Sequence, residues 1–274
     1  MRCVRSMSIC PLLSVHPSRI DAAPADRCPA PEPQWAGLFQ GFGLGGFAEQ
    51  ALIHENQLAV IPKEFPFAQA ALLGCGVVTG AGSVLNSAKV TAGDTVVIFG
   101  AGGVGLNAVS GARIAGASRI VVIDIQAKRL EEAQRFGATD VIDSTKTKPV
   151  EAVRDFLPEG ADHVFDFVGL KSVAEQGLAM LGVGGGLYLV GVASPEIEIG
   201  MNIVSAIGGQ KRVQGVSFGS TNFKRDIPMY AELYLQGRMN LDDLISKRIS
   251  LRDVNEGYAA LKDGSVTRVV VTSF

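Results

Sequence analysis

The chain has 274 residues, 47% hydrophobic and 19% charged, which is the composition of a globular protein of about two domains. Its formal net charge of −2 gives no electrostatic reason to expect nucleic acid or an anionic membrane surface as a partner. No apolar run reaches the roughly 18 residues that span a bilayer, and the four cysteines show no C-x-x-C spacing, so we expect a reducing, cytoplasmic setting without a disulfide scaffold.

The first 36 residues differ from the rest of the chain. Six prolines fall within them, and their hydrophobic residues follow neither a period of 2 nor one of 3.6. A cationic start before an apolar stretch over residues 7–15 leaves a targeting segment as an alternative, although Pro11 interrupts that stretch. We predict an irregular, proline-rich extension over residues 1–36.

Residues 37–78 alternate short apolar pieces with glycines and polar turns, which is typical of strands. Strands are predicted over residues 45–53 and 57–61, with His54 in the turn between them rather than in a metal or proton-transfer role. An Ala-rich helix is predicted from residue 67 to 73, and a further helix to residue 88.

Cys75 lies between two glycines in this segment. Its thiol could be a small buried hydrophobic group, a metal ligand or a nucleophile. The spacing of residues by itself favours the buried role.

Residues 95–124 form the most informative stretch of the chain. An apolar strand over residues 95–99 leads into Gly-Ala-Gly-Gly-Val-Gly at 100–105, which matches G-x-G-x-x-G. Gly100 allows a tight turn, Gly102 lets a pyrophosphate approach the backbone, and Gly105 lets a helix over 106–115 pack closely on the strand. A second strand over 119–123 ends in Asp124, at the distance expected for a ribose-binding acid. This context predicts a dinucleotide site, with a glycine-rich turn that holds no nucleotide as the alternative.

The alternation of strand and helix continues after Asp124. Strands are predicted over residues 140–143, 161–168, 186–192 and 212–219, and helices over 127–136, 150–157 and 173–181. Six strands separated by helices predict an α/β fold with a doubly wound parallel sheet, in the order 3-2-1-4-5-6. His163 begins one of these strands, so we expect a structural role for it.

The last part of the chain changes character. Helices are predicted over residues 227–236 and 254–262, a charged strand-like piece over 241–251, and a final strand over 268–272. This part cannot form a domain alone, so we expect it to pack on the segment before the sheet. The predicted organisation is therefore an extension (1–36), a partial lobe (37–78), a nucleotide-binding domain (79–219) and a return segment (220–274).

Several motifs follow one another in a characteristic order, among them GLGGFAEQALIHENQLAVIP, ALLGCGVVTGAG, GDTVVIFGAGGVGLNAV, FGATDVID and ISLRDVNEGYAAL. Over residues 37–274 the chain resembles the zinc-containing alcohol dehydrogenases of the medium-chain dehydrogenase/reductase family. The resemblance implies a six-stranded Rossmann sheet with a partial GroES-like, β-rich catalytic lobe built from both chain ends. It also implies hydride transfer between an alcohol or aldehyde and NAD, assisted by zinc.

The resemblance assigns roles to single residues. Cys75 matches a zinc ligand, which reverses the preference above, and Thr79 matches a threonine beside the nicotinamide, the candidate catalytic residue. Asp124 implies NAD rather than NADP, because its charge would repel a 2′-phosphate. The implied cofactor-binding set is Gly100, Gly102, Gly103, Val104, Gly105, Asp124, Arg129, Val190, Val216, Phe218 and Arg268.

The chain also departs from the family pattern. The other zinc ligands, the proton relay and the structural zinc lobe of the family have no counterpart before residue 45, so residues 1–36 could be a natural extension or a foreign start. We expect the isolated chain to bind NAD but to oxidise alcohols poorly. The alternatives are an inactive NAD-binding remnant and a zinc-free oxidoreductase similar to quinone reductases. The family further implies a homodimer or higher homo-oligomer, formed at the sixth strand and the β-prone residues 196–204.

Overall fold

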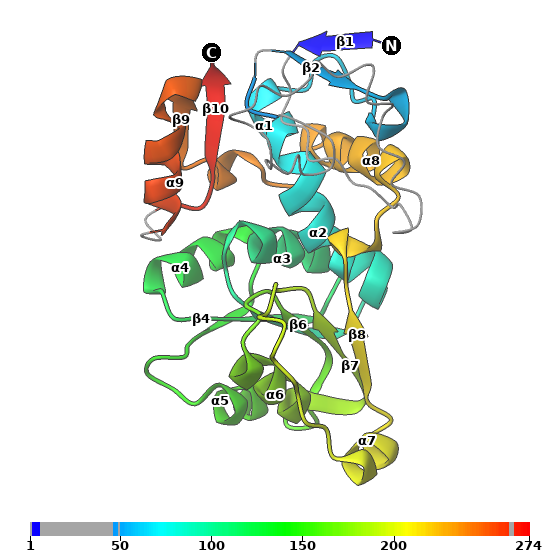
Figure 1. The fold of residues 1–274 in the computed structure, drawn as a ribbon. Coiled ribbons are helices and arrows are strands. Elements are labelled where there is room, and N and C mark those ends of the chain that lie inside the picture. Colours follow the sequence, from blue (N-terminus) through cyan, green and yellow to red (C-terminus); the bar gives the residue numbers. More distant parts are fainter. Residues whose placement is uncertain (1, 6–45, 49, 263–265) are drawn as a thin grey trace.

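The computed structural model describes residues 2–5, 46–48, 50–262 and 266–274 and has two lobes (Figure 1). Most of the predicted extension over residues 1–36 lies outside the described residues. The described part of it is strand β1 (Arg2–Arg5), which pairs antiparallel with β2 (Gln50–Ile53). The larger lobe is built on a sheet, and the smaller lobe collects segments from both ends of the chain.

The larger lobe contains a six-stranded sheet in the order β5-β4-β3-β6-β7-β8, with every neighbouring pair parallel. This is the predicted order 3-2-1-4-5-6. The predicted α/β fold class with a doubly wound Rossmann sheet is confirmed. The strands are β3 (Thr95–Phe99), β4 (Arg119–Asp124), β5 (Asp140–Asp143), β6 (Ala161–Asp166), β7 (Leu181–Leu189) and β8 (Arg212–Gly215).

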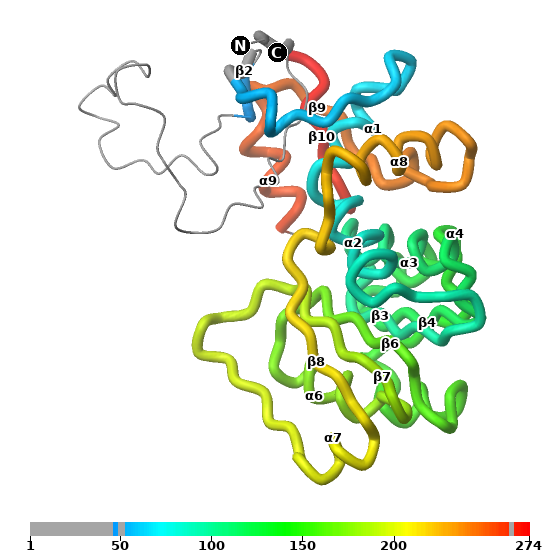
Figure 2. Tube along the Cα trace, turned by 90° about the vertical axis from the view of Figure 1, so that its right-hand side faces the viewer, coloured from blue at the N-terminus to red at the C-terminus, as the bar shows by residue number. Residues whose placement is uncertain are grey.

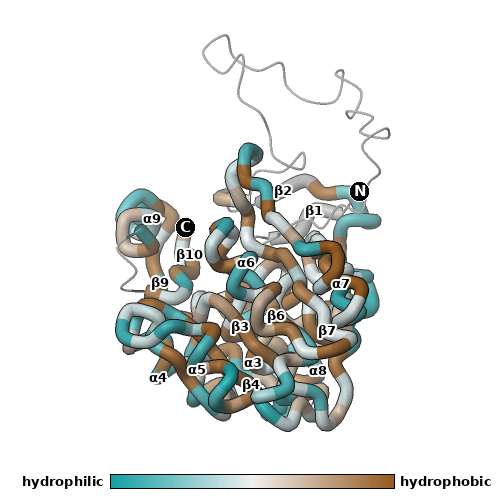
Figure 3. Tube along the Cα trace, turned by 90° about the horizontal axis from the view of Figure 1, so that it is seen from below, coloured by the Kyte–Doolittle hydropathy of each residue, from teal (hydrophilic) through white to brown (hydrophobic). Residues whose placement is uncertain are grey.

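Helices cover both faces of this sheet. Because side chains alternate along a strand, β3 sends Val96 and Ile98 into one apolar core and Val97 and Phe99 into another. Figure 3 shows hydrophobic residues along the central strands. The first core includes α3 (Gly103–Ala115) and α4 (Ala127–Phe136), and the second includes α5 (Pro149–Phe156) and α6 (Lys171–Met180).

A continuous helical segment over residues 67–88 links the two lobes. It consists of α1 (Phe67–Leu72), a π-helical turn (Leu73–Val77), α2 (Val78–Gly82) and a second π-helical turn (Ser83–Ala88). By length and composition it could cross a membrane, but 72% of its most apolar window is buried in the protein. It is therefore a core helix, packed on α3 so closely that a Cβ added to Gly80 would lie 2.1 Å from the Val104 carbonyl oxygen. The predicted domain boundary between residues 78 and 79 falls inside it.

The smaller lobe brings the two ends of the chain together, as the sequence predicted. Its C-terminal part contains α8 (Phe223–Leu235), β9 (Lys247–Ser250), α9 (Val254–Lys262) and β10 (Val269–Ser273). Figure 2 shows these elements beside α1 and β2. The rings of Phe65 and Tyr234 lie 5.1 Å apart, and Gln69 Nε2 donates a hydrogen bond to Asp242 Oδ1.

The predicted strand over residues 57–61 is wrong. Residues 57–61 form no strand: residues 55–57 make a 3-10 turn, no strand of the described chain pairs with residues 58–61, and Val60 is 85% exposed. The β-prone residues 196–204, which were expected to pair with a second copy, form no strand within the chain. There the Asn202 side chain accepts a hydrogen bond from the Ser205 N–H and starts helix α7 (Ile203–Gly209).

Candidate functional site

A cavity of about 440 Å³ lies at the C-terminal ends of β3, β4 and β6. In open parallel sheets this edge, where the strand order reverses, is the usual place of a ligand. The turn after β3, the end of β4 and the start of α6 contribute to its wall. Eight predicted residues line it, namely Gly100, Gly102, Gly103, Val104, Gly105, Asp124, Arg129 and Arg268.

Three glycines of the turn after β3 differ in their backbone conformation and in the space around them. Gly100 has a φ of +92°, in the region that favours glycine. A Cβ on Gly105 would lie 1.8 Å from the Gly100 carbonyl oxygen, so only glycine lets α3 start this close to β3. A Cβ on Gly102 would meet no atom within 4 Å. The backbone at Gly102 therefore opens onto the cavity at the N-terminus of α3, where amide N–H groups attract an anion.

Asp124 ends β4 at the wall of the cavity and is 7% exposed. Its Oδ2 accepts a 2.7 Å hydrogen bond from the backbone N–H of Ala101, and its Oδ1 accepts one of 2.9 Å from Gln126. Each carboxylate oxygen can accept a second hydrogen bond. The carboxylate is therefore fixed in place and still able to accept from a ligand hydroxyl.

Arg268 reaches the same place from the smaller lobe, just before β10. A Cβ on Gly103 would lie 2.5 Å from its Cζ, so the guanidinium lies against the first turn of α3. Burial lowers the pKa of Arg268, which the nearby Cys75 thiolate would partly offset. Within the described ranges no carboxylate forms an ion pair with Arg268, whose Nη1 donates to the Thr267 carbonyl oxygen at 3.1 Å. A partly buried cation above a helix N-terminus favours an anionic ligand.

The turn after β6 completes the wall of the cavity. Asp166 is 2% exposed, and its Oδ1 accepts hydrogen bonds of 2.8 Å from Val168 N–H and 2.9 Å from Gly169 N–H. Burial raises the pKa of Asp166, and these two donors oppose that effect. The carboxylate holds the turn that carries Phe167 and Val168 to the cavity.

The residues predicted to line a nicotinamide pocket lie outside this cavity but at the same edge of the sheet. Val190 follows β7, and Val216 follows β8 and donates its N–H to the Leu189 carbonyl oxygen at 2.9 Å. Phe218 begins a 3-10 turn (Phe218–Ser220) that packs on α2, the helix of Thr79. The fold therefore gathers Thr79, Val190, Val216 and Phe218 around the ends of β7 and β8.

Cys75 is exposed, so its interpretation as a buried hydrophobic group is wrong. It lies in the first π-helical turn beside Arg268, since a Cβ on Gly76 would be 3.3 Å from Arg268 Nη2. Among the described residues no group of three His, Cys, Asp or Glu side chains could hold a metal. A catalytic zinc needs three protein ligands, so the described residues alone do not fit one.

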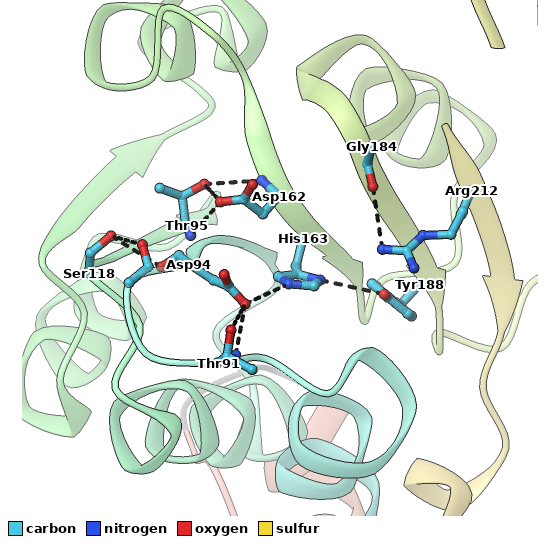
Figure 4. A network of polar contacts seen from close by, with 10 residues as sticks. Thr91, Asp94, Thr95, Ser118, Asp162, His163, Gly184, Tyr188 and Arg212 are labelled. Atoms are coloured by element: carbon cyan, nitrogen blue, oxygen red, sulfur yellow. Dashed lines mark hydrogen bonds and ion pairs between the residues drawn. The ribbon is translucent and has the colours of Figure 1, made fainter. Parts of the chain in front are cut away.

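His163 lies at the opposite end of the sheet, near the start of β6 (Figure 4). Its Nε2 is 3.1 Å from Asp94 Oδ2, and its Nδ1 is 3.4 Å from the Tyr188 hydroxyl. Asp94 also accepts hydrogen bonds from the Thr91 N–H and hydroxyl. His163 thus has the structural position predicted for it. His54 caps the 3-10 turn after β2 by accepting from the Asn56 N–H at 3.1 Å.

Sequence reasoning missed about half of the cavity wall. These residues lie at or just after strand ends, or in the first two turns of α5 and α6, positions that motif spacing does not mark. They are Phe99, Ile123, Ile125, Ser144, Pro149, Phe167, Val168, Leu170, Val173 and Gln176.

The strand order, the glycine turn and the acidic residue at the end of β4 define a Rossmann-type domain. Residues 103–236 match the family model of the zinc-binding dehydrogenases. A curated relative, probable S-(hydroxymethyl)glutathione dehydrogenase 1 of Schizosaccharomyces pombe, is 36% identical over 236 residues, which are 85% of this chain and 62% of that protein. Residues 103–236 therefore form a zinc-binding dehydrogenase domain, and the relatives of this chain include alcohol dehydrogenases. The chain spans about 62% of the length of the curated relative.

Two solved structures are also similar. Benzyl alcohol dehydrogenase from Acinetobacter calcoaceticus has a TM-score of 0.82 and 32% identity, over 84% of this chain and 64% of that one. A zinc-binding dehydrogenase from Sinorhizobium meliloti 1021, described as bound to NADP, has a TM-score of 0.71 and 27% identity, over 77% and 61% of the two chains.

Proposed function

We propose that this chain is an NAD-dependent dehydrogenase that transfers a hydride between an alcohol or aldehyde and the nicotinamide ring. One observation carries the proposal: the cavity joins the open backbone at Gly102, the partly buried guanidinium of Arg268 and the fixed carboxylate of Asp124. The first two suit a pyrophosphate, and the third suits a ribose.

Asp124 supports NAD over NADP. A 2′-phosphate bound at this carboxylate would place two anions side by side in a largely buried site, where like charges repel strongly. Arg129 also lines the cavity and would soften that repulsion. We therefore propose a preference for NAD rather than complete exclusion of NADP.

The nicotinamide would lie toward the ends of β7 and β8, near Thr79 and Phe218. The side chains of Thr79 and Phe218 would orient the ring there, and the closely packed α2 would keep water from it. In the described part of the chain, Cys75 is the single ligand candidate from the family motif at this edge of the sheet. That observation favours a second candidate function, a chain that binds NAD without oxidising alcohols.

The experiment is a fluorescence titration of the purified chain with NADH, compared with two arginine variants. Arg268→Ala should weaken NADH binding by about 10-fold or more, because it removes a charge-assisted contact to phosphate. Arg252→Ala, on the exposed surface of the smaller lobe, should leave it unchanged. Failure of the wild-type chain to bind NADH would refute the proposal.

Turnover and metal content then separate the candidate functions. Alcohol-dependent formation of NADH together with bound zinc supports the dehydrogenase. NADH binding without turnover supports the second candidate. Turnover of a quinone without zinc would support the zinc-free oxidoreductase instead.

A further inference from the structure

The cavity crosses from one face of the sheet to the other. Gly103, the first residue of α3, and Arg268, which lies against it, are on one side. Pro149 begins α5, and Leu170 precedes α6, on the opposite side. A dinucleotide with its pyrophosphate at α3 and its ribose at Asp124 would therefore extend its base toward the first turns of α5 and α6.

This outer part of the cavity is mostly apolar. Ile125 and Leu170 line it and remain 65% and 54% exposed, so their side chains are available to a ligand. Val168 and Val173 line it as well. Aliphatic side chains of this kind suit the flat faces of a purine base, but they do not distinguish one purine from another.

Gln176 is a polar residue in this mostly apolar wall. It lies one turn after Val173 on α6, and residues three apart share one side of a helix, so both line the cavity. Its side-chain oxygen is buried and has no hydrogen-bond partner within the described residues. Ser144, another polar residue of the wall, donates its hydroxyl to the Asp124 carbonyl oxygen at 3.4 Å. A buried amide oxygen without a partner is costly, so a ligand that supplies a donor is favoured.

We propose that Gln176 is a specificity-determining residue that accepts a hydrogen bond from the exocyclic amine of adenine. The inference rests on the proposed function, because it takes the dinucleotide to be bound in this cavity. The oxygen is buried in this structure, and because the terminal torsion of glutamine is broad, rotation of the amide about it would turn the oxygen toward the cavity. The amine N–H then satisfies an oxygen that the protein leaves unpaired, whereas a purine without the amine does not.

The test compares two ligands by isothermal titration calorimetry: NAD and the analogue in which hydrogen replaces the adenine amine. The wild-type chain should bind the analogue about 3- to 10-fold more weakly than NAD, the range for one hydrogen bond. Gln176→Leu should weaken NAD by the same factor and leave the analogue unchanged. Gln134→Leu, on the exposed side of α4, should alter neither affinity.

Two outcomes would overturn the inference. The wild-type chain could bind both ligands equally, or Gln176→Leu could keep the wild-type preference. In either case NAD still binds, so the proposed function stands while the role of Gln176 falls. If neither ligand binds, both fall together. The thermal midpoint of Gln176→Leu should not be lower than that of wild type, since the substitution removes an unpaired buried oxygen, and this shows that the variant is folded.

Discussion

The carboxylate of Asp124 accepts a 2.7 Å hydrogen bond from the backbone N–H of Ala101. This bond ties the end of β4 to the second residue of the glycine-rich turn after β3. The residue proposed to select the ribose therefore also shapes the turn proposed to hold the pyrophosphate.

Asp124→Ala should lower the stability of the protein and also change its preference between NAD and NADP. Two backbone donors, those of Ala101 and Gln126, lose their acceptor, so the free energy of unfolding should fall by about 1–3 kcal/mol. The ratio of NAD to NADP affinity should move toward one, because the repelling charge is gone. Titrations with both dinucleotides and urea unfolding measure the two effects, with Asp155→Ala on the exposed surface of α5 as the control. Equal affinity of the wild-type chain for NAD and NADP would contradict the role of Asp124.

Two glycines of the turn should respond differently to alanine. Gly105→Ala places a Cβ 1.8 Å from the Gly100 carbonyl oxygen, so we expect a loss of about 3 kcal/mol or more of stability, or no folded protein. Gly102 has an ordinary φ of −72° and open space beside it, so Gly102→Ala should fold as well as wild type. It should nevertheless bind NADH at least about 10-fold more weakly, because the methyl group occupies the place of the pyrophosphate.

Thermal melts measure the stability of the Gly105→Ala and Gly102→Ala variants, and NADH titrations measure their affinity. A Gly102→Ala variant with wild-type affinity would show that the phosphates bind elsewhere.

The contact between Asp94 and His163 predicts a dependence of stability on pH. Burial raises the pKa of Asp94, but hydrogen bonds from Thr91 and His163 outweigh it and bring the pKa below the ordinary 3.8. A carboxyl whose pKa is lower in the folded state stabilises the fold above its unfolded pKa, and this contribution is lost as the pH falls through the folded value. Asp94→Asn should therefore be less stable than wild type near neutral pH, and the difference should shrink below about pH 4.

Urea unfolding at neutral and acidic pH tests this prediction. Asp155→Asn, an exposed carboxyl on α5, is the control. A difference between Asp94→Asn and wild type that stays constant with pH would show that the ionisation of Asp94 is not linked to folding.

We also expect the chain to self-associate. All four residues of β8 are exposed at the edge of the sheet. The neighbouring α7 exposes Ile203, Val204 and Ile207, each more than 70% accessible. An unpaired edge beside an apolar surface favours pairing with a second copy. Light scattering should give a mass above that of the 28.7 kDa chain, and Ile207→Asp should lower it. Tyr258→Ser, in the smaller lobe, should leave the measured mass unchanged. A wild-type chain that is monomeric would contradict the proposed interface.

The regular part of the fold could be predicted from the sequence because its signals are local. The helix over residues 127–136 and the strand over 140–143 were predicted to the residue, since apolar spacing and Gly137 mark their ends. The predicted strand over 57–61 failed because an apolar run does not reveal whether another strand will lie beside it. Within the β-prone run 196–204, Asn202 caps a helix that begins at Ile203, which the hydrophobic pattern did not reveal.

The residues of the site also differ in whether a local sequence signal marks them. The glycines and Asp124 could be found because their chemistry depends on spacing along a short stretch. Arg268 was found through family resemblance alone, since it reaches the cavity from a segment more than 100 residues later in the chain. Gln176 was missed because a polar residue on an amphipathic helix is ordinarily assigned to solvent. Its unpaired oxygen becomes visible only when α6 is placed on the sheet.

The close approach of Gly82 and Gly219 has a consequence for how this protein could be divided. A Cβ on Gly82 would lie 2.7 Å from the Gly219 carbonyl oxygen, so the chain enters and leaves the sheet at nearly the same point. The sheet and its helices are therefore a cassette inserted into the other lobe, with its two junctions touching. Because the two junctions lie side by side, we expect that the cassette could be exchanged as one piece with that of a relative, with changes confined to this one region.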